Sequence, residues 1–362
     1  MEILHHFDSG VVQPFEISGD RITFDLRPGQ RILNVLIRNA PERLAMDLLV
    51  DENGEKFLLN QGLLVSEDGE TFRSVPVEKP QEGMLRASVS VPGGQVRLAT
   101  RYPYGRDALD RLLCDTHRVP YANVRLFGRG HRRVPIFDFG EDGEGKPHHI
   151  FIAGEDTWET AGCWVADGLV RTLCSDRPFA DALLERGVIH VAPLASPYSA
   201  TMPSASYTTL EGKGIYGAAT WGDEAPPPEY ALLREEVVRI IREKRLGLML
   251  TIHSWQGSHE VSEVGTIRRA GENTLTESRS EWATATMETL MRNVPQSQHR
   301  ISERIWHSGL ARDYLLDKHN AITFRIEVTT AGLGPDGFRL TAQRMLDNLG
   351  RITDWAPACA SA

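Results

Sequence analysis

The sequence predicts an α/β protein in which an N-terminal antiparallel β-sandwich precedes a domain built on a mostly parallel mixed sheet with helices on both faces. In the first hundred residues, short runs that alternate apolar and polar side chains are separated by Gly, Asp, Asn and Pro turns, as half-buried strands are. After Tyr104, apolar strands alternate with longer amphipathic helices, which indicates a parallel sheet covered on both faces.

The expected N-terminal domain covers residues 1–105. Its predicted strands are residues 21–26, 31–37, 44–50, 84–91 and 95–100. Turns are expected at 51–54 and 92–94, where Asp, Asn, Pro and Gly favour reversals of the chain. We find no catalytic pattern in this domain, so we expect the chemistry in the remaining chain.

The expected second domain covers residues 106–362. Its predicted strands are residues 134–138, 149–153, 188–193, 246–252 and 321–326. Its predicted helices are residues 107–114, 159–173, 228–244, 278–294 and 337–353. The helix over 228–244 follows two prolines, starts at a third and carries basic residues at its end, which suits the helix dipole. In sheets of this kind, functional sites form beyond the carboxyl ends of the strands.

Candidate functional residues follow three of these strands. Asp156 and Glu159 stand after one strand at the mouth of a helix, and His253 and Glu327 end two later strands. Two carboxylates and an imidazole are ligands that zinc accepts, and a further carboxylate can serve as a general base. The layout predicts a mononuclear metal hydrolase with Asp156, Glu159 and His253 as metal ligands and Glu327 as the base that activates water.

Composition narrows the range of partners. The net charge of −9 argues against nucleic acid or an anionic membrane as the main partner. No run of eighteen apolar residues and no signal peptide is visible, and the four cysteines lack C-x-x-C spacing. We therefore expect a cytoplasmic protein with reduced thiols that acts on a small-molecule or peptide-like substrate. The oligomeric state stays open.

Four segments occur in a particular order along the chain. They are Tyr-Pro-Tyr at 102–104 before a helix, Asp-Thr-Trp-Glu at 156–159, Thr-Ile-His-Ser at 251–254 and Phe-Arg-Ile-Glu at 324–327. Together they resemble the zinc carboxypeptidases of the funnelin superfamily, within them the cytosolic carboxypeptidase branch. The resemblance covers nearly the whole chain. It implies a β-sandwich before a carboxypeptidase-like α/β domain, one zinc ion, and Glu327 as general base.

The first departure from this family pattern concerns the metal. The family usually has His as first ligand, and the aligned residue here is Asp156. Two carboxylates and one imidazole form a harder, more negative set, which tolerates manganese or iron better and leaves the ion less Lewis-acidic. Zn²⁺ remains the expected ion. Alternatively, Asp156 caps the following helix, since Asp is a favoured N-cap residue.

The second departure concerns substrate recognition. The family's Asn-Arg pair, which holds a peptide carboxylate, aligns with Ala218 and Ala219, and a further family arginine aligns with Thr209. Two charge-assisted contacts to a carboxylate are therefore missing. This argues against ordinary exopeptidase action and favours a neutral or differently charged group, such as an amide, an ester or a modified amino acid.

Other side chains near these segments are candidates for substrate contact. Besides Thr209, these are Lys213, Tyr216 and Trp255. An exposed loop position is the commoner case for a lysine such as Lys213, and the aromatic residues are equally compatible with packing. His259 is a reserve metal ligand if Asp156 is a cap.

Three functions remain open from the sequence. The first is a metallohydrolase that cleaves an amide or ester, the second a true metallocarboxypeptidase on a specialised peptide, and the third a pseudoenzyme or binding module that kept the fold. The presence of Glu159, His253 and Glu327 together argues against the third. No Gly-x-Ser-x-Gly elbow supports a serine hydrolase.

Overall fold

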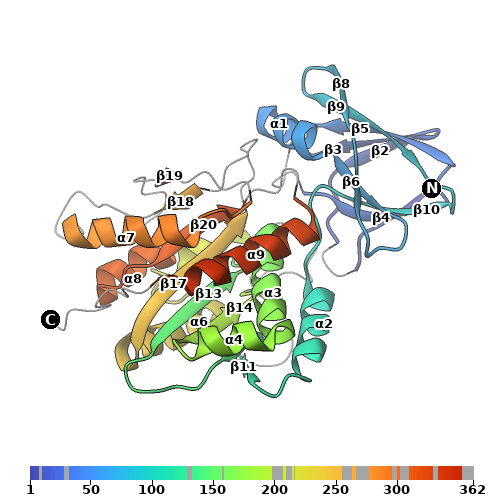
Figure 1. Cartoon of the computed structure of the whole chain (residues 1–362). Coiled ribbons are helices and arrows are strands. Elements are labelled where there is room, and N and C mark those ends of the chain that lie inside the picture. The colour runs from blue at the N-terminus through green and yellow to red at the C-terminus, as the bar shows by residue number, and fades with distance from the viewer. Residues whose placement is uncertain are drawn as a thin grey trace.

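The computed structural model shows two adjoining parts, an N-terminal pair of sheets and a larger α/β unit (Figure 1). It describes residues 1–7, 10–27, 32–128, 133–156, 159–197, 207–208, 214–215, 217–254, 263–265, 277–295, 300–301, 310–328 and 333–352. The predicted fold class is confirmed. The division of the chain near residue 105 stays a prediction.

Two five-stranded sheets form the N-terminal part. The first has the order β1 (Glu2–Leu4), β4 (Asn34–Arg38), β10 (Gln95–Ala99), β6 (Leu63–Ser66) and β7 (Arg73–Val75), and all its pairs are antiparallel. The second has the order β2 (Phe15–Ser18), β3 (Arg21–Asp25), β5 (Arg43–Leu49), β9 (Met84–Ser90) and β8 (Glu78–Gln81). Buried apolar residues from both sheets share one core, and each of the five predicted runs overlaps a strand.

Two features of this part differ from the expectation. Strands β3 and β5 run parallel, because the chain passes through the other sheet as β4 between them. The expected turn at 51–54 is wrong: it is the start of helix α1 (Glu52–Gln61), and the Asp51 carboxylate accepts a hydrogen bond from Gly54 N at 2.8 Å. Asp favours turns and helix caps for the same reason, since it binds nearby backbone N–H groups in both.

An eight-stranded mixed sheet organises the second part. Its order is β11 (Ala122–Phe127), β12 (Val134–Phe139), β14 (Val188–Ala192), β13 (Pro147–Ala153), β17 (Arg245–Ser254), β20 (Phe324–Val328), β18 (Glu263–Gly265) and β19 (Arg300–Ile301). The four strands β14, β13, β17 and β20 are parallel neighbours, and each overlaps a predicted strand. Their carboxyl ends therefore meet at one edge.

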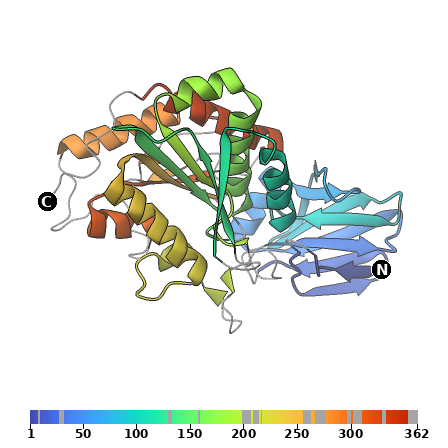
Figure 2. The same cartoon turned by 90° about the horizontal axis from the view of Figure 1, so that it is seen from below.

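Helices cover both faces of this sheet (Figure 2). One apolar core contains residues of α2 (Arg106–Thr116), α3 (Thr160–Ser175), α4 (Arg177–Leu184), α7 (Glu277–Leu290) and α9 (Pro335–Leu349). The other contains residues of α6 (Pro228–Glu243) and α8 (Ala311–His319). Strand β13 supplies Phe151 to the first core and Ile150 and Ile152 to the second, as side chains alternate across a strand. Within the described residues, no helix is long and apolar enough to cross a membrane.

Candidate metal centre

Asp156, Glu159 and His253 come together beyond the carboxyl ends of two neighbouring strands. Asp156 and Glu159 follow β13, and His253 lies near the end of β17, where it pairs in register with Glu327 of β20. One ligand atom from each of the three residues lies within 4.8 Å of the others. Their exposed fractions are 0%, 1% and 2%. The structure therefore gathers residues that are 97 positions apart at the extremes into one buried cluster.

A sharp turn after β13 brings the first carboxylates into the interior. Gly154 has a φ of +67°, a conformation that side chains with a Cβ rarely adopt. A Cβ there would also come within 2.7 Å of Leu194 Cδ1 and 2.9 Å of Cys163 Sγ. Glycine at this position lets the chain leave the strand and turn toward the buried cluster at Asp156.

The Asp156 carboxylate does not bind the first turn of α3. Its Oδ1 accepts a hydrogen bond from the backbone N–H of Gly217 at 2.9 Å, while the N-cap of α3 is Glu159 and makes no side-chain cap bond. The interpretation of Asp156 as a helix cap therefore finds no support in the hydrogen bonds.

Two oxygens of the cluster are buried without a hydrogen-bond donor in the described part of the chain. They are Asp156 Oδ2 and Glu159 Oε1. A buried carboxylate oxygen in this situation is energetically unfavourable, and it becomes favourable when it binds a cation. These two oxygens belong to the same residues that supply the grouped ligand atoms, so the donor set fits a metal ion.

The His253 ring lies between two glutamates. Its Nδ1 contacts Glu159 Oε2, and its Nε2 lies 3.0 Å from Glu155 Oε2. Glu155 is 2% exposed and also accepts a hydrogen bond from Trp221 Nε1. Sequence reasoning gave Glu155 no role. Its position next to Asp156 in the sequence was the available signal. The sequence does not show in which direction the Glu155 side chain points.

The pKa values in the cluster show an excess of buried negative charge. Burial, and then the nearby Glu159 charge, raise the pKa of Asp156 well above its ordinary value, and burial also raises the pKa of Glu159. Burial and Arg325 lower the pKa of His253, but Glu159 and Glu155 outweigh them and raise it to about 10. All three shifts favour added positive charge, which a divalent cation would supply.

Arg325 is a second residue that sequence reasoning missed. It lies two positions before Glu327 on β20, so both side chains stand on the same face of the strand. The Arg325 guanidinium forms an ion pair with Glu327 Oε1, and the two side chains are 14% and 11% exposed. The negative charge of Glu327 also raises the pKa of Glu159, which places the candidate base within electrostatic reach of the cluster.

The predicted substrate contacts fall outside the described residues. This holds for Thr209, Lys213, Tyr216 and Trp255, and for the reserve ligand His259.

The segment that carries Ala218 and Ala219 is described, and it lies beside the cluster. It forms the short 3₁₀ helix η3 (Gly217–Thr220), whose first residue donates the hydrogen bond to Asp156. Ala218 is buried and Ala219 half-buried, and both have only a methyl side chain.

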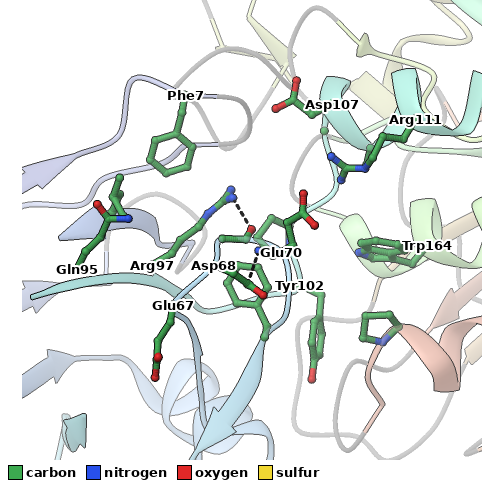
Figure 3. A pocket seen from close by; sticks show the side chains of 17 residues that line it. Phe7, Glu67, Asp68, Glu70, Gln95, Arg97, Tyr102, Asp107, Arg111 and Trp164 are labelled. Atoms are coloured by element: carbon green, nitrogen blue, oxygen red, sulfur yellow. Dashed lines mark hydrogen bonds between the residues drawn. The ribbon is translucent and has the colours of Figure 1, made fainter. Parts of the chain in front are cut away.

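A cavity of about 380 Å³ lies elsewhere, where the N-terminal sheets meet α2, α3 and the start of α9 (Figure 3). Arg97 lines this cavity. Its guanidinium lies 4.6 Å from the Phe7 ring centre and 5.6 Å from that of Phe72. Trp164 of α3 lines the opposite side. None of the three clustered residues lines this cavity, so it is separate from the candidate metal centre.

Comparison with solved structures identifies the fold. A metallo-carboxypeptidase from Burkholderia cenocepacia superposes with a TM-score of 0.82 at 17% identity, over 97% of this chain and 98% of that one. A metallo-carboxypeptidase from Pseudomonas aeruginosa, in complex with (2-guanidinoethylmercapto)succinic acid, gives 0.79 at 19% identity over 97% and 98%. Bovine thrombin-activatable fibrinolysis inhibitor, in complex with tick carboxypeptidase inhibitor, gives 0.52 at 14% identity over 69% and 95%.

Sequence comparison adds no closer assignment. No family model and no curated protein matches this sequence. The structural superpositions cover 97% of this chain. It therefore has the fold of metallo-carboxypeptidases over nearly its whole length, including the N-terminal sheets.

Proposed function

We propose that this protein is a metal-dependent hydrolase that cleaves an amide or ester bond in a small or modified substrate. The observation that carries the proposal is the buried grouping of Asp156, Glu159 and His253, with ligand atoms within 4.8 Å of one another. Glu327 pairs in register with His253 on the next strand, so a carboxylate stands beside the group. The metallo-carboxypeptidase fold supports the same chemistry.

The proposed cofactor is one Zn²⁺ ion, held by Asp156, Glu159 and His253. Carboxylate oxygens and an imidazole nitrogen are normal zinc ligands, and the same set also suits Mn²⁺ or Fe²⁺. When bound, such an ion polarises a carbonyl oxygen and lowers the pKa of water. The two buried oxygens that have no donor among the described residues, together with the raised pKa of each ligand, support this assignment.

The other residues act on protons and on position. Glu327 accepts a proton from the attacking water at a carboxylate oxygen and passes it to the leaving group. Arg325 pairs with that carboxylate through Oε1 and orients it. Thr209, Lys213, Tyr216 and Trp255 are proposed to contact the substrate.

The proposed substrate class follows from the segment beside the cluster. Ala218 and Ala219 have only methyl groups, so they offer no hydrogen bond to a free carboxylate. Each hydrogen bond to a charged group contributes roughly 1.5–3 kcal/mol. A substrate without a free α-carboxylate therefore loses little binding free energy at this segment. We expect amides and esters to be cleaved better than free acids.

The test combines metal analysis with a matched substrate panel. Full-length protein is purified, its metal is quantified by inductively coupled plasma mass spectrometry, and N-acyl amino acids are offered as free acids, amides and methyl esters. We expect about one divalent ion per chain and faster turnover of amides or esters. Glu327→Gln should retain the metal and lose turnover.

Other outcomes would change the proposal. A preference for free acids would indicate a true carboxypeptidase. Protein that binds no divalent ion would indicate a binding module, and full activity of Glu327→Gln would exclude this residue as the general base.

A further inference from the structure

Glu155 contacts one ring nitrogen of His253, and Glu159 contacts the other. Glu155 Oε2 lies 3.0 Å from Nε2, whereas Nδ1 contacts Glu159. Glu155 and His253 are each 2% exposed, so water does not compete for this contact. An ionised carboxylate only accepts hydrogen bonds. Glu159, on the Nδ1 side, is one of the proposed metal ligands, so an ion held by both residues would lie at Nδ1. The proton of the ring would then lie on Nε2, where Glu155 accepts it.

This proton position determines which nitrogen can bind a metal. A neutral imidazole has one N–H and one lone pair, and the hydrogen bond at one nitrogen sets the role of the other. With the proton on Nε2, the lone pair lies on Nδ1, the nitrogen beside Glu159. We infer that Glu155 is a positioning residue that fixes the metal-binding tautomer of His253, and that Trp221 holds Glu155 in place.

Contacts from two elements hold Glu155. Trp221, which directly follows η3 and is fully buried, donates from Nε1 to Glu155 Oε1. Tyr230 of α6 donates from its hydroxyl to the backbone carbonyl of Glu155. The two carboxylate oxygens thus accept from two different donors, the Trp221 N–H and the His253 N–H.

Because the Glu155 carboxylate accepts hydrogen bonds from two donors, Glu155→Gln is an informative substitution. A glutamine side chain has nearly the same shape as glutamate, but it has one acceptor oxygen and one NH₂ donor. In Glu155→Gln, whichever donor does not receive the oxygen faces an NH₂ group. Either the Trp221 contact is lost, or the His253 ring shifts to the tautomer with its proton on Nδ1.

The inference rests on the proposed metal function, and its readout is metal binding rather than turnover. Zinc affinity of the full chain is measured by competition with a chromogenic chelator. We expect the zinc dissociation constant of Glu155→Gln to rise by roughly 10- to 100-fold, as for other residues that orient a metal ligand. Glu236→Gln removes a different buried carboxylate, one that lies on α6. It should leave the zinc dissociation constant unchanged.

A second background tests the role of Trp221. In Trp221→Phe, the indole donor is gone, so the glutamine of the Glu155→Gln variant is free to turn its oxygen to His253. The effect of Glu155→Gln on zinc affinity should therefore be smaller in the Trp221→Phe protein than in the wild type. An equal effect in both backgrounds would remove Trp221 from the inference.

The remaining outcomes are also decisive. Nitrogen-15 spectra of the zinc-loaded wild type should show the His253 proton on Nε2, and a proton on Nδ1 would overturn the inference. So would Glu155→Gln with a zinc dissociation constant within twofold of the wild type. If Glu155→Gln fails to fold, Glu155→Asp, which retains the charge but is one methylene shorter, replaces it with the same expected loss of affinity. A wild type that binds no divalent ion would instead refute the proposed function itself.

Discussion

Arg325 and Glu327 lie two residues apart on β20, and the guanidinium of Arg325 pairs with the carboxylate of Glu327. The strand period places both side chains on one face, and the register places Glu327 next to His253. A guanidinium in this position forms a charge-assisted hydrogen bond with the carboxylate and limits its rotation. The candidate general base is therefore held in one orientation beside the candidate metal centre.

Arg325→Met should lower kcat without loss of metal. The pair is a charge-assisted hydrogen bond, for which roughly 1.5–3 kcal/mol corresponds to a decrease of about tenfold to 150-fold. The kcat of Arg325→Lys should lie between those of the wild type and Arg325→Met, because an ammonium keeps the charge but lacks the planar fork of a guanidinium. Steady-state kinetics and metal content are the measurements.

Arg344→Met provides the control for this charge change. Arg344 pairs with Asp347 at 3.6 Å and is 50% exposed, so its loss should leave kcat unchanged. Unchanged kcat in Arg325→Met as well would show that the pair does not assist Glu327.

Asp156→Asn should affect metal binding and the metal-free protein in opposite directions. The amide keeps the shape and the acceptor for Gly217 N–H, but it cannot ionise, whereas ionisation of the Asp156 carboxyl is opposed by burial and by the charge of Glu159. Zinc affinity should fall at least 100-fold, because a neutral amide is a far weaker ligand than a carboxylate. The thermal midpoint of the metal-free variant should rise above that of the metal-free wild type.

Calorimetry with and without a chelator tests both effects. A metal-free variant that melts below the metal-free wild type would contradict the account of excess buried charge. Unchanged zinc affinity would exclude Asp156 as a ligand.

Acid should destabilise the protein through His149. Burial lowers the pKa of His149 to about 3, and the ring lies so close to Gly187 and Gly247 that an added Cβ would come within 2.8 Å and 2.5 Å of it. The folded-state pKa lies below the ordinary value of about 6.5, so the unfolded chain binds a proton that the folded protein does not. Stability is complete above pH 6.5 and decreases as the pH falls toward 3.

Urea unfolding between pH 7 and pH 4 measures this effect. The contribution of His149 is about 1.4 kcal/mol of unfolding free energy per pH unit in the lower part of that range. His149→Phe should show a pH dependence that is shallower by this amount, whatever its stability at pH 7. Equal slopes for both proteins would contradict the assignment.

Asp51→Ala should destabilise the N-terminal part by about 1 kcal/mol, because it removes the cap of α1. Asp51→Ser retains an acceptor and should lose much less. Asp110→Ala, which removes an exposed partner of Arg106 on α2, should change the unfolding free energy by less than about 0.5 kcal/mol. A loss in Asp51→Ala no larger than in this control would show that the cap contributes nothing.

Local patterns in the sequence were sufficient for most of the architecture. Alternation of apolar side chains located β3, β5 and β9, and continuous apolar runs located the buried strands β13 and β17. The turn expected at 51–54 was wrong because Asp binds nearby N–H groups in turns and caps alike. The buried residues of α1 recur at the three- and four-residue spacing of a helix, at Gly54, Phe57, Leu58 and Gln61.

The sequence alone predicted that Asp156, Glu159, His253 and Glu327 lie close together, because each lies near or just after the end of a strand and parallel strands end at one edge of a sheet. Only the tertiary structure decided which side chains surround them. Glu155 reaches His253 and Trp221, and Gly217 reaches Asp156, across 98, 66 and 61 positions of the chain. The physical reason is that side-chain direction after an irregular turn depends on contacts with distant segments, whereas strand direction follows from a pattern that repeats every two residues.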